Sequence, residues 1–234
     1  MPQSSLRWDA HPARAGVVVL VLHGGAVTGR QPNRPWSHNT IRLVPFARAL
    51  AHVPGPIAVA RLRFRYRGWN GGEASPVHDA RWALDQIRSR YPGVPIVLVG
   101  HSMGGRTALT VAGTEPDVRL VVGLAPWIER GDLRPGAGQR TVLIHGDRDL
   151  ICPLMASRVT VEAMQADGLV ASLIRVARSD HAMLVRARVW TTLVTDTISV
   201  AFATELEIDG APRRGPLGAA VARVVHTDGA FVDV

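Results

Sequence analysis

The sequence predicts an α/β domain built on a mostly parallel, doubly wound sheet, and three observations support this prediction. Short runs rich in β-branched residues alternate along the chain with segments of helical spacing. The apolar runs are nearly continuous, which is typical of strands that are buried on both faces. The chain has 234 residues, of which 47% are hydrophobic, so it can bury a large core. Repeated alternation of strand and helix indicates βαβ units with right-handed crossovers.

The expected elements follow one another in a regular order. The strands are predicted at 17–22, 57–64, 96–100, 118–124, 141–145 and 170–176. The helices are predicted at about 39–52, 76–90, 103–113, 154–167 and 183–203. Pro56 and Pro95 stand directly before strands, and "YPG" at 91–93 closes a helix, as expected of these residues. We therefore expect an N-terminal extension over 1–16, the domain over 17–204, and a tail of uncertain order over 205–234, where the pattern is lost.

The charge of the chain does not favour a nucleic-acid partner. The formal net charge is +8, and all 27 basic residues are arginines. They are scattered from Arg7 to Arg223, and the only local cluster is "RLRFRYRG" at 61–68. Only 5% of the residues are aromatic, so stacking platforms for bases are scarce. We interpret the charge as a solvated surface and expect a small-molecule substrate as the partner, with the oligomeric state left open.

The compartment is predicted from what the sequence lacks. Residues 1–16 contain no apolar segment of the kind found in signal peptides. Cys152 is the single cysteine, so no intrachain disulfide forms, which fits a reducing compartment. The longest apolar run, residues 16–22, is too short to span a bilayer. These observations predict a cytoplasmic protein without a membrane partner.

One serine lies at a corner between a strand and a helix. In "IVLVGHSMGGRTAL", residues 96–109, Ser102 follows a β-run and opens a helical segment. The turn must be tight, and Gly100 and Gly104 provide the small neighbours that it needs. The hydroxyl is then exposed above the sheet, beside the free backbone N–H groups of a helix N-terminus. Such a position suits a nucleophile whose developing oxyanion is stabilised by these amides.

A serine nucleophile needs a base, and the base needs a group that orients it. The carboxyl ends of parallel strands meet at one crevice, so both groups should follow later strands. "TVLIHG" is followed by "DRDLICP", which contains Asp147 and Asp149. "VASLIRVA" is followed by "RSDHAML", which contains His181. The chain order is therefore serine, aspartate, histidine, each just past a different strand.

These motifs together resemble the α/β-hydrolase superfamily, and the resemblance covers about residues 17–200. "GHSMGG" resembles its nucleophile elbow, and "VVLVLHGGAV" at 18–27 resembles its oxyanion strand and loop. "HGDRDLICP" resembles its acid loop, often written G-x-x-D-x-x-x-P, and "DHAML" resembles its histidine loop. The resemblance implies a small serine esterase-like member without a lid.

The resemblance also implies roles for individual residues. Ser102 is the nucleophile, His181 the general base and then acid, and Asp149 the orienting acid, since it is the fourth residue of a motif that begins at Gly146. Asp147 remains the rival acid. The oxyanion hole would use the backbone N–H groups of Met103 and Gly25, with Ala26 as the alternative to Gly25.

Three other histidines are expected to be structural. We expect His23 to hold the backbone of the oxyanion loop, His101 to pack or hydrogen-bond under the nucleophile, and His145 to be a satisfied core residue. No H-E-x-x-H, C-x-x-C or G-x-G-x-x-G motif in a suitable context is present in the sequence, so no metal and no cofactor are predicted. The glycine-rich "GWNGG" at 68–72 is interpreted as a loop at the crevice mouth.

Two departures from the family pattern are expected. Only sixteen residues precede the strand at 17–22, so one or both of the family's N-terminal strands should be missing. The strand at 57–64 would then lie at or near the sheet edge, with its arginines preventing edge-to-edge pairing. Residues 125–140 are too few for a cap domain, which leaves an open crevice with Trp127 and Ile128 as an apolar wall.

The predicted reaction is hydrolysis of carboxylic esters, and by extension thioesters, through an acyl-enzyme on Ser102. Two alternatives stay open. An acyltransferase or lyase on the same scaffold differs in what accepts the acyl group, which the sequence does not encode. A non-catalytic binding protein would keep Ser102 exposed through the fold alone.

Overall fold

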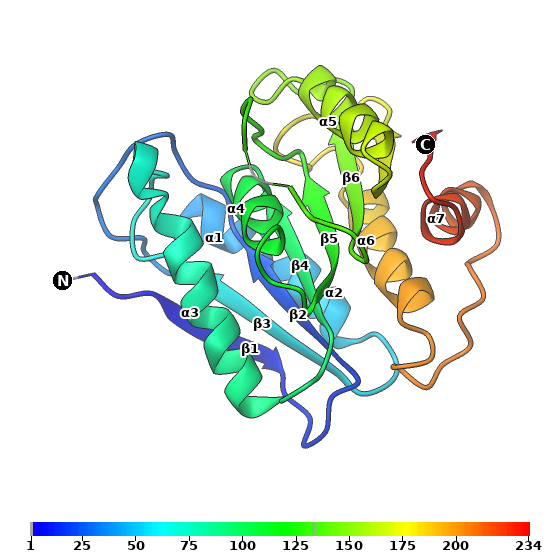
Figure 1. The fold of residues 1–234 in the computed structure, drawn as a ribbon, viewed down its shortest axis with the longest axis horizontal. Helices are drawn as coiled ribbons and strands as arrows, with labels where there is room; N and C mark the ends of the chain where they lie inside the picture. Colours follow the sequence, from blue (N-terminus) through cyan, green and yellow to red (C-terminus); the bar gives the residue numbers. More distant parts are fainter. Residues whose placement is uncertain (1, 133) are drawn as a thin grey trace.

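A sheet of eight strands forms the centre of the computed structural model, which describes residues 2–132 and 134–234 (Figure 1). The strands are β1 (Ser5–Ala10), β2 (Val17–Leu22), β3 (Ile57–Arg63), β4 (Ile96–His101), β5 (Val118–Leu124), β6 (Arg140–Gly146), β7 (Val170–Val176) and β8 (Phe231–Asp233). Their order across the sheet is β1-β3-β2-β4-β5-β6-β7-β8. β1 runs antiparallel to β3, and the other neighbouring pairs are parallel. The predicted mostly parallel, doubly wound sheet is confirmed.

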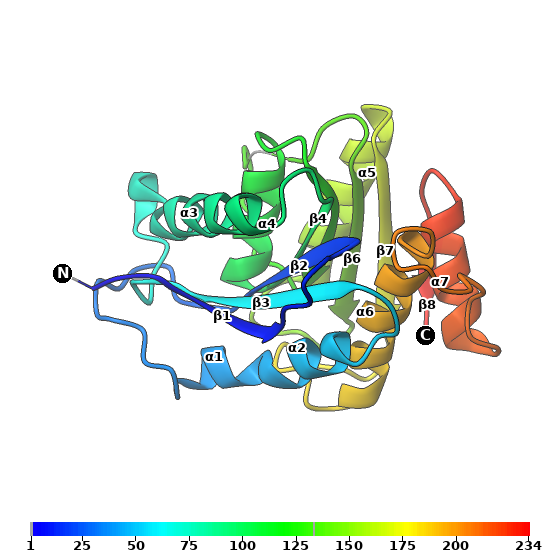
Figure 2. The same ribbon diagram turned by 90° about the horizontal axis from the view of Figure 1, so that it is seen from below.

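Helices cover both faces of this sheet (Figure 2). They are α1 (His38–Arg42), α2 (Val44–Ala51), α3 (Ser75–Arg90), α4 (Met103–Ala112), α5 (Leu154–Ala166), α6 (Ala187–Ala201) and α7 (Pro216–His226), with a 3₁₀ turn at Gly71–Glu73. Apolar residues of α2, α6 and α7 share one core cluster. Apolar residues of α3, α4 and α5 share the other.

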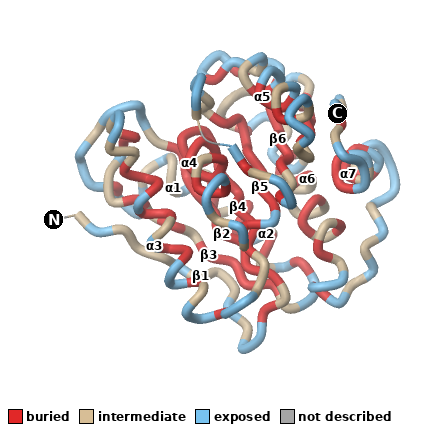
Figure 3. Tube along the Cα trace, in the orientation of Figure 1, coloured by how far each residue is buried: buried red, intermediate tan, exposed pale blue. Residues whose placement is uncertain are grey.

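The central strand β2 explains why its sequence is a continuous apolar run. Val17, Val19 and Val21 belong to the cluster under α2 and α6. Val18, Leu20 and Leu22 belong to the cluster under α3 and α4. Successive side chains of a strand point to opposite faces, so a strand with helices on both sides must be apolar at every position. The middle of Figure 3 is therefore occupied by buried residues, drawn in red.

The expectation that 57–64 lies at the edge of the sheet is wrong. β3 is flanked by β1 on one side and β2 on the other. The reason is the amphipathic segment Ser5–Ala10, which supplies the edge strand β1 and partners for the arginines. Arg61 donates to both carboxylate oxygens of Asp9, at 2.6 and 2.9 Å, and Arg63 donates to Ser5 Oγ at 3.0 Å. Among the described residues, one strand precedes β2, where the family pattern has two.

Both ends of the chain contribute to the same sheet. The segment 1–16, expected as an extension, contains β1. The segment 205–234, expected as a tail, contains α7 and β8, and β8 pairs in parallel with β7 through Leu173 and Phe231. β8 was too weak to be recognised in the sequence, because a three-residue strand has no measurable period.

The connection between β5 and β6 is short. Residues 125–132 and 134–139 form no helix or strand, so no cap covers the carboxyl end of the sheet there. Within the described residues, no helix is both long and apolar enough to cross a membrane.

Candidate active site

Ser102 lies at the tight turn from β4 into α4. Its backbone has φ 53° and ψ −117°, outside the conformations that side chains prefer. The turn is possible because a Cβ on Gly100 would clash with the carbonyl of Gly104, and a Cβ on Gly104 would clash with the carbonyl of Leu22. The serine is 7% exposed, so it is reached only from the loop side. The sequence motif thus produces the strained elbow that it predicts.

The backbone of Ser102 is fixed by three hydrogen bonds. Its N–H donates to the carbonyl of Leu124 at 3.0 Å. Its carbonyl accepts from the N–H groups of Arg106 and Trp127, both at 3.1 Å. The elbow is therefore joined to β5 and to the loop that follows it, which holds the serine in one place.

The loop after β2 packs directly on the elbow. A Cβ on Gly24 would lie 3.5 Å from the Cβ of Ser102, and a Cβ on Gly25 would clash with the side chain of Met103. Met103 is the first residue of α4, so its N–H has no acceptor within the helix. The N–H of Gly25 likewise has no partner in the part of the chain that the structure describes. Two unpaired amides thus lie on the two segments that meet beside Ser102.

The alternative Ala26 is not available as an oxyanion donor. Its N–H donates to the carbonyl of Arg67 at 2.9 Å, within the bridge that joins Ala26 to Gly68. The geometry therefore favours Gly25 over Ala26.

His23 holds the same loop from below. Its Nδ1–H donates to the carbonyl of Gly24 at 2.6 Å, and its Nε2 accepts from the N–H of Phe64 at 3.2 Å. Burial lowers the pKa of His23 to about 4, although the bond to Gly24 opposes this. The imidazole is neutral near pH 7 and supports backbone, as the sequence predicted.

Asp149 lies at the carboxyl end of β6, and four donors converge on its carboxylate. Oδ1 accepts from the N–H groups of Ile151 and Cys152, both at 2.8 Å. Oδ2 accepts from Nδ1–H of His181 at 2.8 Å and from Nε2–H of His145 at 3.1 Å. Burial alone would raise the pKa of Asp149, but these hydrogen bonds outweigh it and hold the pKa well below its usual range. The carboxylate is charged, and one of its oxygens orients His181.

The rival acid Asp147 faces a different neighbour. Its carboxylate lies 3.6 Å from Nη1 of Arg175, and its backbone N–H donates to the carbonyl of Val176. The structure places Asp149 beside His181, and it places Asp147 beside Arg175 of β7.

His181 lies in the loop between β7 and α6. Because Nδ1 carries the proton given to Asp149, Nε2 is the basic nitrogen, and it has no hydrogen-bond partner within the described residues. The carbonyl of His181 accepts from Nε2–H of His101 at 3.0 Å, and the two rings lie 4.8 Å apart. Burial, followed by the neighbouring His181, lowers the pKa of His101 to about 3. His101 is thus a neutral support for the histidine loop, on the segment that also carries Ser102.

Two further groups lie around Asp149, the imidazole of His145 and the thiol of Cys152. His145 is satisfied, as predicted, with Nε2–H shared between Asp149 and the carbonyl of Cys152 and with Nδ1 bonded to Ser157 Oγ at 2.8 Å. Its bond to the acid was not anticipated, although its position four residues before Asp149 was a signal. The thiol of Cys152 is 5% exposed, and burial raises its pKa to about 11, so it is protonated.

Arg106, one turn after Ser102, organises the wall of the site. Its guanidinium lies 4.1 Å from the ring of Trp69 and 4.4 Å from the ring of Trp127. It also donates to Asp132 at 2.7 Å and pairs with Glu129 at 2.9 Å. Only 7% of Arg106 is exposed, so this is a partly desolvated cation held between two indoles and two carboxylates. Sequence reasoning proposed Trp127 as wall but missed the arginine that positions it.

Exposed apolar side chains stand on the loops that carry the site residues. They are Val27, Leu150, Ile151, Leu184 and Val185, each at least half exposed. Among residues 2–132 and 134–234, no group of three or more histidine, cysteine or acidic side chains is arranged to hold a metal ion.

The sheet order, the elbow and the loops around it define an α/β-hydrolase fold. A family profile described as serine aminopeptidase, S33, matches residues 65–139.

Individual relatives are distant in sequence. Cutinase 2 from Thermobifida cellulosilytica is 32% identical over 73 residues, which are 31% of this chain and 28% of that protein. The matched segment therefore spans just over a quarter of that relative. An α/β serine hydrolase without a lid from Xanthomonas campestris superposes with a TM-score of 0.57 at 21% identity, covering 95% of this chain and 87% of its own. The esterase Pf2001 from Pyrococcus furiosus gives a TM-score of 0.62 at 16% identity and covers 84% of both chains.

Proposed function

We propose that this protein is a serine hydrolase that cleaves carboxylic esters through an acyl-enzyme on Ser102. The observation that carries the proposal is the hydrogen bond of 2.8 Å between His181 Nδ1 and Asp149 Oδ2. The carbonyl of His181 is in turn bonded to His101, the residue before Ser102 at the strained elbow. The bond to Asp149 fixes the tautomer in which Nε2 of the imidazole is free to take a proton from a hydroxyl.

The reaction follows from these groups. Ser102 Oγ attacks the ester carbonyl while His181 Nε2 removes its proton, and the buried carboxylate of Asp149 stabilises the imidazolium. The amides of Gly25 and Met103 hold the negative charge of the tetrahedral intermediate. His181 then protonates the leaving alcohol, and a water activated by the same nitrogen releases the acid and regenerates the serine.

The choice of an ester rather than a peptide rests on the open site and on the relatives. No cap excludes water from the elbow over the described residues, which suits substrates with a good leaving group. The distant relatives include a cutinase and an esterase. The family profile over residues 65–139 carries the name of a peptidase, so amide substrates belong in the test.

The test is labelling followed by turnover. A fluorophosphonate probe should label the wild-type protein and fail to label Ser102→Ala, whose far-UV circular dichroism should stay native. The substrates are a panel of p-nitrophenyl esters of increasing acyl length, with a p-nitroanilide in parallel. The wild-type protein should turn over the esters, and Ser102→Ala should lower that turnover by at least about 10³-fold. Equal labelling of both proteins would contradict the proposal.

The acceptor of the acyl group is tested separately. With a competing alcohol present, a hydrolase should still give mainly the free acid. A product mixture dominated by the new ester would identify an acyltransferase on the same scaffold.

A further inference from the structure

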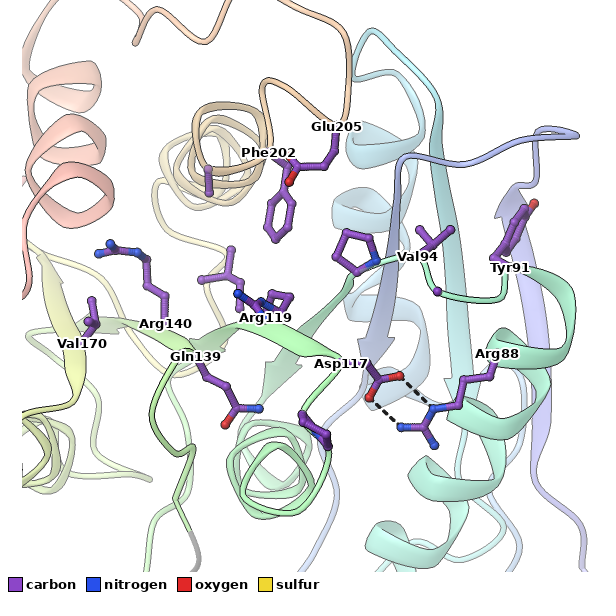
Figure 4. A pocket seen from close by; sticks show the side chains of 16 residues that line it. Arg88, Tyr91, Val94, Asp117, Arg119, Gln139, Arg140, Val170, Phe202 and Glu205 are labelled. Carbon is purple, nitrogen blue, oxygen red and sulfur yellow. Dashed lines mark hydrogen bonds and ion pairs between the residues drawn. The ribbon is translucent and has the colours of Figure 1, made fainter.

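A cleft of about 600 Å³ lies at the amino-terminal edge of the sheet (Figure 4). Its lining includes Arg119 near the start of β5, Arg140 at the start of β6, Val170 at the start of β7, and Phe202 after α6. Ser102 follows the carboxyl end of β4, so the cleft and the candidate active site lie at opposite ends of the strands. Its volume is in the range of small-molecule sites.

One charged pair in the lining is already neutralised. Arg88 Nε and Nη2 donate to the two carboxylate oxygens of Asp117, at 2.8 and 2.7 Å, and Nη2 also bonds Glu115 at 2.6 Å. These bonds raise the pKa of Arg88 and lower the pKa of Asp117. This bidentate pair, drawn with dashed lines in Figure 4, leaves no free charge for a ligand.

Arg140 is different, because its charge is partly desolvated without a carboxylate partner. Its Nη1 donates only to backbone carbonyls, Val224 O at 2.9 Å and Thr227 O at 2.7 Å. No ion pair to Arg140 forms within the described part of the chain. Burial lowers its pKa, and the nearby charge of Asp228 opposes the effect. The guanidinium remains protonated, and its hydrogen bonds go to carbonyls at the end of α7 rather than to a carboxylate.

Arg119 adds a second unpaired cation. Leu120 is in register with Arg140 across β5 and β6, so Arg119 is one residue from the partner of Arg140. It is exposed, and no carboxylate lies within 4.0 Å of it among residues 2–132 and 134–234. In Figure 4, Arg119 lies below Phe202, the guanidinium of Arg140 lies to the left of that ring on the side of α7, and Glu205 lies on the other side of the ring.

We propose that this cleft binds a small organic carboxylate that carries an apolar ring or chain. The carboxylate lies on Arg119 and Arg140, whose planar forks match its two oxygens. The apolar part lies against Phe202, Pro95 and Leu120, which line the same cleft. Glu205, the acidic side chain on the far side, disfavours a more highly charged dianion and keeps the anionic end on the arginine side.

The binding experiment uses the whole chain, labelled with ¹⁵N, and 3-phenylpropionate as the probe. The backbone amides of Gly93 and Gly138, which line the cleft, should shift on titration, and those of Gly25 and Met103 should not. The uncharged 3-phenylpropan-1-ol should bind at least about tenfold more weakly, because it lacks the charge-assisted bonds.

The variants locate the site. Arg119→Gln should weaken 3-phenylpropionate binding at least about tenfold, and it should fold normally because Arg119 is exposed. Val94→Trp, at a half-buried position of the lining, should fill the cleft and abolish binding. Arg188→Gln is the matched control, since Arg188 is an exposed arginine near the start of α6 and does not line the cleft.

Several results would overturn the proposal. Shifts confined to the amides of Gly25 and Met103 would place the probe at the other end of the sheet. Equal affinity of the alcohol and the carboxylate, or unchanged affinity in Arg119→Gln, would remove the role of the arginines. Inorganic phosphate binding as tightly as the carboxylate would contradict the ligand class. None of these measurements depends on turnover, so they stand or fall independently of the proposed esterase activity.

Discussion

Charged side chains at the two ends of this sheet differ in how they are paired. At the carboxyl end, the carboxylate of Asp149 receives four hydrogen bonds, and the cation of Arg106 is matched by Asp132, Glu129 and two indoles. At the amino end, Arg119 and Arg140 face a cleft without a carboxylate partner among the described residues. The first arrangement is preorganised for chemistry, since its dipoles are already oriented. The second is where we propose that an anionic ligand binds.

The largest effect should come from replacing the acid that orients His181 at the carboxyl end of the sheet. Asp149→Asn should lower kcat/KM for a p-nitrophenyl ester by about 10³- to 10⁴-fold, because the amide no longer holds the tautomer that leaves Nε2 of His181 basic. Asp147→Asn is the matched control and should stay within a few-fold of wild type. A loss of turnover in Asp147→Asn alone would reverse the assignment of the acid.

The next largest effect should come from removing the guanidinium of Arg106 from the wall of the site. Arg106→Met should lower the free energy of unfolding by about 3 kcal/mol, because the largely enclosed carboxylate of Asp132 loses its guanidinium partner. Chemical denaturation measures this loss, and KM should rise more than kcat falls, since Trp127 loses its support. Arg130→Met, an exposed arginine in the same loop, should change neither quantity appreciably.

Protonation of two buried histidines should lower the free energy of unfolding as the pH falls. His101 and His23 have pKa values lowered by burial to about 3 and about 4, whereas in the unfolded chain they titrate near 6.5. Between pH 6.5 and pH 4 the unfolded chain therefore binds more protons, so the free energy of unfolding falls as the pH falls. Each histidine should contribute about 3 kcal/mol of that loss.

The measurement is chemical denaturation at a series of pH values. His101→Gln should flatten the slope of stability against pH, and the exposed His226→Gln should not. Parallel slopes for the wild type and His101→Gln would show that this imidazole is not held neutral.

The smallest expected effect concerns a polar group at the amino end. Gln139 donates from Nε2 to the carbonyls of Ala112, Glu115 and Val118, at 2.9, 2.9 and 2.8 Å. Gln139→Ala should lower the free energy of unfolding by about 1–2 kcal/mol and leave kcat/KM within twofold. Gln3→Ala, at an exposed position, is the control. A large loss of turnover in Gln139→Ala would mean that the two ends of the sheet are coupled.

Much of the fold could be predicted from the sequence, because β2 and its neighbours are apolar at every position and alternate with helices. The N-terminal strand could not, since the partner of Arg61 is Asp9, more than fifty residues earlier, and pairing at that distance has no local signature. β8 was missed for a related reason, because three residues carry no period.

The candidate site divides along the same line. Ser102, Asp149 and His181 each follow a strand within a recognisable motif, so their placement at the carboxyl end of the sheet could be predicted, and the structure joins Asp149 to His181. The support of Arg106 by Trp69 and Trp127 could not, because it joins one helix to two separate loops through side-chain packing alone. The amino-edge cleft has no motif, since it is formed by the starts of strands rather than by any one segment.

Ser102 has a positive φ of 53°, so the position that presents the hydroxyl also strains the backbone. A backbone held in such a region is less stable than a relaxed one by about 1–3 kcal/mol. Glycine would relieve this penalty and also delete the hydroxyl. If Ser102 is the nucleophile proposed above, a glycine selected for thermal stability alone would remove it, so stabilising substitutions should leave this turn unchanged.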